Sequence, residues 1–281
     1  MSTTLPPPDR HSPIRVGIGG WTYEPWRGVF YPKGLPQAQE LHHASRLLTA
    51  IEINGTYYGT QKRSSFAKWR DETPDDFVFS LKASRYATNR RVLAEAGDSI
   101  DHFIGSGLAE LGPKLGPIVW QFAPTKRFDA DDFEAFLARL PAEVEGIPLR
   151  HVMDVRHESF ACSAYVQLAR RYRASTVFTH GDGYPAIGDL TGPVVYLRLM
   201  QTAADVPTGY AADALDAIAR CAEAWSAGYE PADLPRVEPV DTGAPITEPV
   251  TREVYVYFIS GAKERAPAAA QALIQRLPAP A

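Results

Sequence analysis

The chain has 281 residues, of which 45% are hydrophobic, so it can bury a core of the size found in a single α/β barrel. Its net charge of −4 gives no overall electrostatic reason to expect binding to nucleic acid or to a membrane surface. The two cysteines, Cys162 and Cys221, share no metal-binding or redox spacing, and no apolar run approaches the roughly 20 residues that span a bilayer.

The first 13 residues are polar and rich in proline, and they lack the apolar core of a signal peptide. We therefore expect residues 1–13 to form a disordered tail, and the protein to be cytoplasmic without contact to a membrane. A single domain is expected over residues 14–277.

Short apolar runs, which predict strands, alternate along the chain with segments of helical spacing. The strands are expected at Arg15–Gly20, Ala50–Asn54, Phe77–Lys82, Ile118–Phe122, His151–His157, Thr176–His180, Val194–Leu199 and Glu253–Phe258. The helices are expected at Leu41–Leu48, Ser64–Glu72, Ile100–Leu111, Asp131–Leu140, Tyr165–Tyr172, Tyr210–Trp225 and Ala266–Leu277. This order predicts a TIM-type (β/α)8 barrel. A doubly wound open sheet is the alternative, but no dinucleotide-binding glycine pattern follows any strand.

Two irregularities interrupt the regular order of the predicted barrel. Residues 181–193 leave room only for a loop, so the sixth helix is expected to be missing or vestigial. Residues 229–252 form an insertion rich in proline, which runs from a helix into a strand and so belongs at the N-terminal face of the barrel. We interpret it as passive or as a contact between subunits, and expect a monomer or a homodimer.

Most of the predicted strands carry a polar or charged residue at or near the C-terminal end. An unpaired buried charge costs roughly several kcal/mol, so such residues are not scattered through strands without partners. Parallel strands that surround one pocket would gather these side chains at a single barrel end. The centre of the expected site contains Glu52, Lys82, Asp154, Arg156 and Arg198.

Paired carboxylates on the second and fifth strands suit acid/base work on a glycosidic or similar bond. Glu52 and Asp154 are therefore candidate catalytic residues, and His157 is a third. Each has a structural alternative: Glu52 could simply neutralise Lys82 or Arg198, and His157 could cap a loop. If the protein is an enzyme, we expect it to resemble a hydrolase or a lyase.

Basic side chains outnumber acidic ones at the expected site, which favours a small anionic or sugar-containing ligand. The candidate substrate-binding residues are Trp21, Asn54, Tyr57, Lys82, Arg85, Gln121, Arg156, Arg198 and Tyr257. His180 could join Glu52 and Asp154 around a metal, but no HxH or HExxH spacing supports this. We expect neither a metal nor a cofactor.

One loop, residues 82–91, is locally basic and has aromatic neighbours such as Tyr57 and Tyr86. Aromatic rings and arginines together can bind single-stranded nucleic acid, which is the alternative function. The acidic chain as a whole argues against high affinity.

Several blocks of this sequence resemble the YecE-like family, also called domain of unknown function 72. They are Gly17–Tyr23, Trp26–Leu35, Ile51–Tyr58, Lys82–Tyr86 and Asp154–Phe160, and the resemblance spans roughly residues 14–277. It implies a TIM-type barrel but no established activity.

The chain departs from the family pattern, which places histidines where Asn89 and Met200–Gln201 stand and a glutamate where Asp154 stands. It therefore resembles a divergent member, in which a mechanism driven by histidine is not expected.

Overall fold

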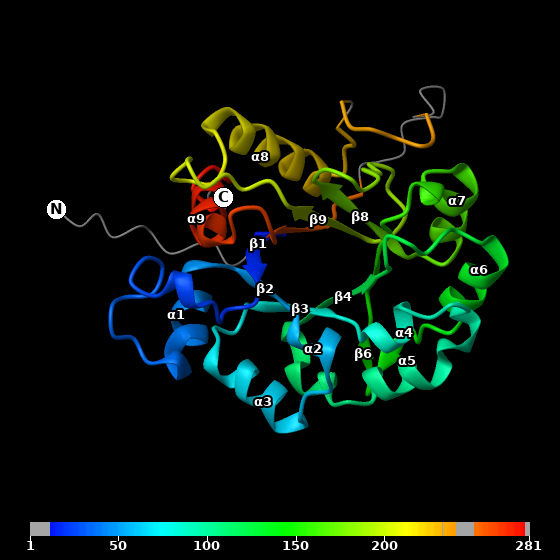
Figure 1. Cartoon of the computed structure of the whole chain (residues 1–281), viewed down its shortest axis with the longest axis horizontal. Helices are drawn as coiled ribbons and strands as arrows, with labels where there is room; N and C mark the ends of the chain where they lie inside the picture. The colour runs from blue at the N-terminus through cyan, green and yellow to red at the C-terminus, as the bar shows by residue number, and fades with distance from the viewer. Residues whose placement is uncertain (1–11, 232, 240–249, 279–281) are drawn as a thin grey trace.

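The computed structural model describes residues 12–231, 233–239 and 250–278. The expected tail, apart from its last two residues, and the stretch 240–249 of the expected insertion lie outside these ranges. Eight strands form a closed parallel barrel in chain order, with the last strand paired to the first (Figure 1). They are β1 (Ile14–Gly19), β2 (Ala50–Ile53), β3 (Val78–Lys82), β4 (Leu115–Gln121), β7 (His151–Asp154), β8 (Ser175–His180), β9 (Val194–Leu199) and β10 (Glu253–Phe258). The predicted barrel is confirmed.

Helices surround the strands (Figure 1). The longer ones are α1 (Glu40–Leu47), α3 (Arg63–Glu72), α5 (Gly97–Ile104), α6 (Ala130–Ala138), α7 (Ser163–Arg171), α8 (Ala212–Ser226) and α9 (Ala266–Ile274). Two single-turn helices, α2 (Gly55–Tyr58) and α4 (Arg85–Thr88), follow β2 and β3 directly. Residues 181–193 contain no helix, as expected. Among the described residues, no helix is both long and apolar enough to cross a bilayer.

The helix predicted over Ile100–Leu111 is wrong in its second half. The α5 helix ends at Ile104, and a separate 3-10 segment, Leu108–Lys114, leads into β4. Gly107 between them has a φ of 106°, which lies outside the helical region and which glycine adopts at little steric cost. Apolar residues continue at helical spacing across this break, so the sequence pattern did not indicate it.

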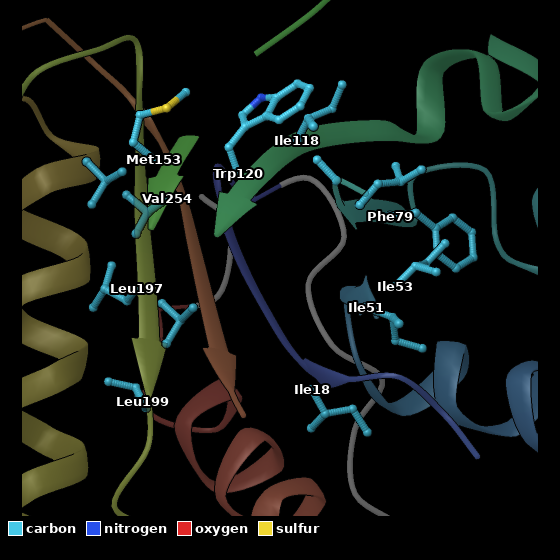
Figure 2. Packing of buried hydrophobic residues seen from close by; sticks show 14 of the residues in the cluster. Ile18, Ile51, Ile53, Phe79, Ile118, Trp120, Met153, Leu197, Leu199 and Val254 are labelled. Atoms are coloured by element: carbon cyan, nitrogen blue, oxygen red, sulfur yellow. The ribbon is translucent and has the colours of Figure 1, made fainter. Parts of the chain in front are cut away.

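Side chains alternate between the two faces of the barrel wall. Outward-facing residues such as Ile51, Phe79 and Leu197 belong to the large core packed under the helices (Figure 2). The inward-facing residues fill the barrel, and they are Ala50, Val78, Val119, Val152, Val177, Val194, Tyr196, Tyr255 and Tyr257. The same inward face also carries four polar residues, because each stands two positions after one of the residues just named. They are Glu52, Gln121, Asp154 and Arg198. The barrel therefore changes from an apolar to a polar interior toward the C-terminal ends of its strands.

Candidate functional site

Arg198, on β9, lies inside the barrel and is only 1% exposed. Its Nη1 atom donates to Oδ2 of Asp154 at 2.5 Å and to Oε1 of Gln121 at 3.0 Å, while Nη2 donates to Oε1 of Glu52 at 2.9 Å. Burial alone would lower the pKa of Arg198, but the two carboxylates raise it above its ordinary value. One guanidinium thus joins β9 to three other strands, β2, β4 and β7.

Glu52 has both carboxylate oxygens engaged. Oε1 accepts from Arg198, and Oε2 accepts a hydrogen bond from the hydroxyl of Tyr196 at 2.8 Å. Of the two partners expected for Glu52, the structure therefore gives Arg198. Tyr196 was not among the predicted site residues, although it lies two positions before Arg198 and so faces the same side of β9.

Asp154, the last residue of β7, is less completely engaged than Glu52. Its Oδ2 atom accepts from Arg198 and from Nη2 of Arg156 at 3.1 Å. Within the described residues, its Oδ1 atom has only a long contact of 3.4 Å, from Nε of Arg156. Arg156 stacks 4.7 Å from the ring centre of Tyr184, a loop residue that no sequence pattern indicated. In the part of the chain that the structure describes, the Oδ1 atom of Asp154 is therefore the carboxylate oxygen of this network without a strong partner, and Arg156 lies over it.

Lys82, the last residue of β3, is 7% exposed. Its ammonium lies 4.0 Å from the ring centre of Tyr57, and within the described residues no carboxylate lies at ion-pair distance from it. Burial and, after it, the neighbouring charge of Arg198 lower the pKa of Lys82 from its ordinary value of 10.5 to about 8. Lys82 still carries a charge near neutral pH, so it is a nearly buried cation that lacks a paired anion.

The remaining predicted binding residues divide into those near this network and those away from it. Asn54 donates to the backbone oxygen of Glu52 at 3.3 Å, and Tyr257 shares a 2.8 Å hydrogen bond with Ser80, fully enclosed in the barrel. Arg85 lies on the exposed α4 turn beside Tyr86.

Trp21 does not join the charged network. Its indole packs edge-on against Trp69 at 5.2 Å and Phe79 at 6.4 Å, so it belongs to the outer core beneath α3. The position of Trp21 in the loop after β1 did not indicate that its side chain would pack against the outer core and away from the charged network.

His157 caps a turn. Its Nδ1 atom accepts from the backbone N–H of Ser159 at 3.1 Å, at the start of the 3-10 turn Glu158–Phe160. This hydrogen bond gives His157 the structural role, capping a loop, that the sequence had left open as an alternative to catalysis. His180 is half-buried, and burial lowers its pKa. In the part of the chain that the structure describes, no three His, Cys, Asp or Glu side chains gather in a way that could hold a metal.

The charges of the network do not cancel. Lys82, Arg156 and Arg198 carry three positive charges against the two negative charges of Glu52 and Asp154, which leaves one positive charge. Such an excess of positive charge suits a bound anion.

Comparison with known proteins agrees with this barrel. The chain is 27% identical to UPF0759 protein YecE of Escherichia coli over 142 residues, which covers 49% of this chain and 48% of YecE. It is 23% identical to UPF0759 protein YunF of Bacillus subtilis over 189 residues, covering 65% of this chain and 64% of YunF. The match thus spans about half the length of YecE and somewhat under two thirds of YunF.

Solved structures show the same fold. A DUF72 family protein from Thermotoga maritima superposes with a TM-score of 0.67 at 20% identity, over 94% of this chain and 97% of that one. A DUF72 family protein from Enterococcus faecalis gives 0.61 at 16% identity, over 94% and 97%. The sequence pattern of the family described as "Protein of unknown function DUF72" matches residues 15–281. The chain therefore belongs to the DUF72 family.

Proposed function

We propose that this protein is an enzyme that binds a small anionic or sugar-containing substrate at the C-terminal ends of the barrel strands. The observation that carries the proposal is Lys82, a nearly buried cation without an anion beside a network in which Arg198 is paired twice. A substrate carboxylate or phosphate at Lys82 and Arg156 would supply the missing negative charge. Since TIM barrels place their active sites at this face, the position also fits.

The two carboxylates receive different roles in this proposal. Glu52 has no free oxygen and holds Arg198 in place, so we assign it a positioning role. Asp154 is the acid/base candidate, because its Oδ1 atom has only the long contact to Arg156. A substrate anion that draws Arg156 toward itself would uncover this oxygen for proton transfer. Hydrolysis and elimination both need such a transfer, which is the basis for a hydrolase- or lyase-like reaction.

The binding step is tested by calorimetric titration with glucuronate, a sugar acid used here as a probe. We expect Lys82→Met and Arg156→Leu each to weaken binding at least about tenfold, the effect of losing one charged contact. The variant Arg220→Ala, which changes an exposed arginine on α8 outside the barrel interior, serves as the control and should bind like the parent chain. Equal affinity in all of these chains would overturn the assignment of the anion to Lys82 and Arg156.

Binding of single-stranded nucleic acid is the second candidate function. Tyr58 and Tyr86 are 64% and 60% exposed, and both rings lie near the guanidinium of Arg85, at 6.0 and 5.4 Å. Exposed aromatic rings beside an arginine can stack bases. A gel shift with single-stranded DNA at low salt would reveal such binding, and its absence there would exclude this candidate.

A further inference from the structure

A basic groove lies between the segment that follows β3 and the loop that follows β4. Its volume is about 520 Å³, within the range of about 300–1,000 Å³ typical of small-molecule sites. Four of the eight lining residues are arginine or lysine and none is acidic. They are Thr88, Asn89, Arg90, Arg91, Ala123, Thr125, Lys126 and Arg127.

Most of the positive charge in this groove is uncompensated. The guanidinium groups of Arg91 and Arg127 are on exposed residues and have no hydrogen bond or ion pair within the described residues. Arg90 donates only to neutral groups, the backbone oxygen of Tyr86 and the hydroxyl of Ser99, each at 2.8 Å.

Lys126 is the exception, because it pairs with Asp132 at 2.7 Å. Four positive charges therefore face one carboxylate, which leaves three. Cations gathered in this way repel one another, and a bound anion would relieve the repulsion.

A buried hydroxyl in the same groove supplies an independent observation. Thr88 is 0% exposed, and within the described residues its Oγ1 atom has no hydrogen-bond partner. Leaving a buried hydroxyl unsatisfied costs about 1–3 kcal/mol. Among the described residues nothing accepts a hydrogen bond from this hydroxyl, although Thr88 is one of the residues that line the groove.

The groove adjoins the barrel opening through Asn89, one of its lining residues. The amide of Asn89 donates to the hydroxyl of Tyr57 at 3.2 Å, and the ring of Tyr57 contacts Lys82. Yet none of the lining residues belongs to the charged network inside the barrel, so the groove is a site of its own.

We propose that this groove binds the phosphate groups of a phosphorylated small molecule. Arginine guanidinium groups bind phosphate oxygens in pairs of parallel hydrogen bonds, and Arg91 and Arg127 are free to do so. A small ligand fits better than a nucleic-acid strand, because the groove has the volume of a small-molecule site and the whole chain carries a net charge of −4. The proposal goes beyond the substrate site at Lys82 and does not depend on it.

Titration of the full chain with pyrophosphate tests this site. We expect Arg91→Ala/Arg127→Ala to weaken pyrophosphate binding at least tenfold. Arg220→Ala, which changes an exposed arginine on α8, is the matched control and should leave affinity unchanged. Since Arg91 and Arg127 are exposed, circular dichroism should show an intact fold in the double variant.

Two results would overturn the proposal. One is pyrophosphate affinity in the double variant equal to that of the parent chain. The other is binding of a single-stranded oligonucleotide, lost in the double variant, with no binding of pyrophosphate, because this would assign the groove to nucleic acid instead.

Discussion

At the scale of single residues, Arg198 carries one positive charge between two carboxylates that are each 0% exposed. Replacing a whole buried ion network by apolar groups can be harmless, but removing one partner leaves the other charges uncompensated. The contribution of Arg198 to stability is therefore best measured by replacing Arg198 alone, with Glu52 and Asp154 left in place.

Arg198→Met should lower the free energy of unfolding by about 3–5 kcal/mol, because two buried carboxylates lose their shared partner. Urea denaturation followed by circular dichroism measures this. Arg171→Met is the matched control, since Arg171 pairs with Glu134 on the surface with 65% and 38% of the side chains exposed. That change should stay within about 1 kcal/mol. Similar losses in both variants would contradict the central role of Arg198.

At the scale of elements, the strands were predicted well and the shortest helices were missed. The α2 and α4 helices have one turn each, too short for any apolar periodicity to indicate them. Tyr57 and Arg85 lie on these turns, so the sequence named both residues without predicting how they are held. The hairpin of β5 (Glu143–Val144) and β6 (Ile147–Pro148) was also missed, being two residues per strand.

At position 17, strand β1 contributes a glycine to the inner face of the barrel. A Cβ atom on Gly17 would lie 2.0 Å from the backbone oxygen of Ala50 on β2 and 3.1 Å from the ring of Tyr257 on β10. The neighbouring strands β2 and β10 therefore lie so close to β1 that no residue larger than glycine fits at position 17 without a shift.

Gly17→Ala should lower the free energy of unfolding by about 1–3 kcal/mol or more, because the backbone of β1 or β2 must shift. Gly59→Ala is the control: Gly59 is exposed and an added Cβ would meet nothing within 4 Å. It should change stability by no more than about 0.5 kcal/mol. Equal denaturation midpoints for the two variants would show that the barrel can accommodate a methyl group at position 17.

At the scale of the whole molecule, the alternation of strands and helices along the chain predicted the barrel, and the polar residues near the strand ends predicted the centre of its polar interior. Glu52, Lys82, Asp154 and Arg198 could be grouped because they all stand near the C-terminal ends of parallel strands. Which of them pair could not be predicted, since Arg198 reaches Glu52 and Asp154 across the interior, 146 and 44 residues away in the chain.

The buried titratable groups make the stability of the whole chain depend on pH above neutrality. The folded pKa of Lys82 is about 8, below the ordinary value of 10.5, so between these values the unfolded chain binds more protons and stability rises with pH. The difference corresponds to roughly 3 kcal/mol at most. Burial also lowers the pKa of Lys114, which acts in the same direction.

Tyr196 and Tyr257 act in the opposite direction, because burial raises each pKa well above 10. Above pH 10 the unfolded chain loses phenolic protons that the folded chain keeps, so stability falls. We therefore expect the free energy of unfolding to rise from about pH 8 to 10 and to decrease beyond, as measured by urea denaturation at fixed ionic strength. Lys82→Met should reduce the rise and leave the decrease intact; an unchanged rise in that variant would show that Lys82 keeps an ordinary pKa.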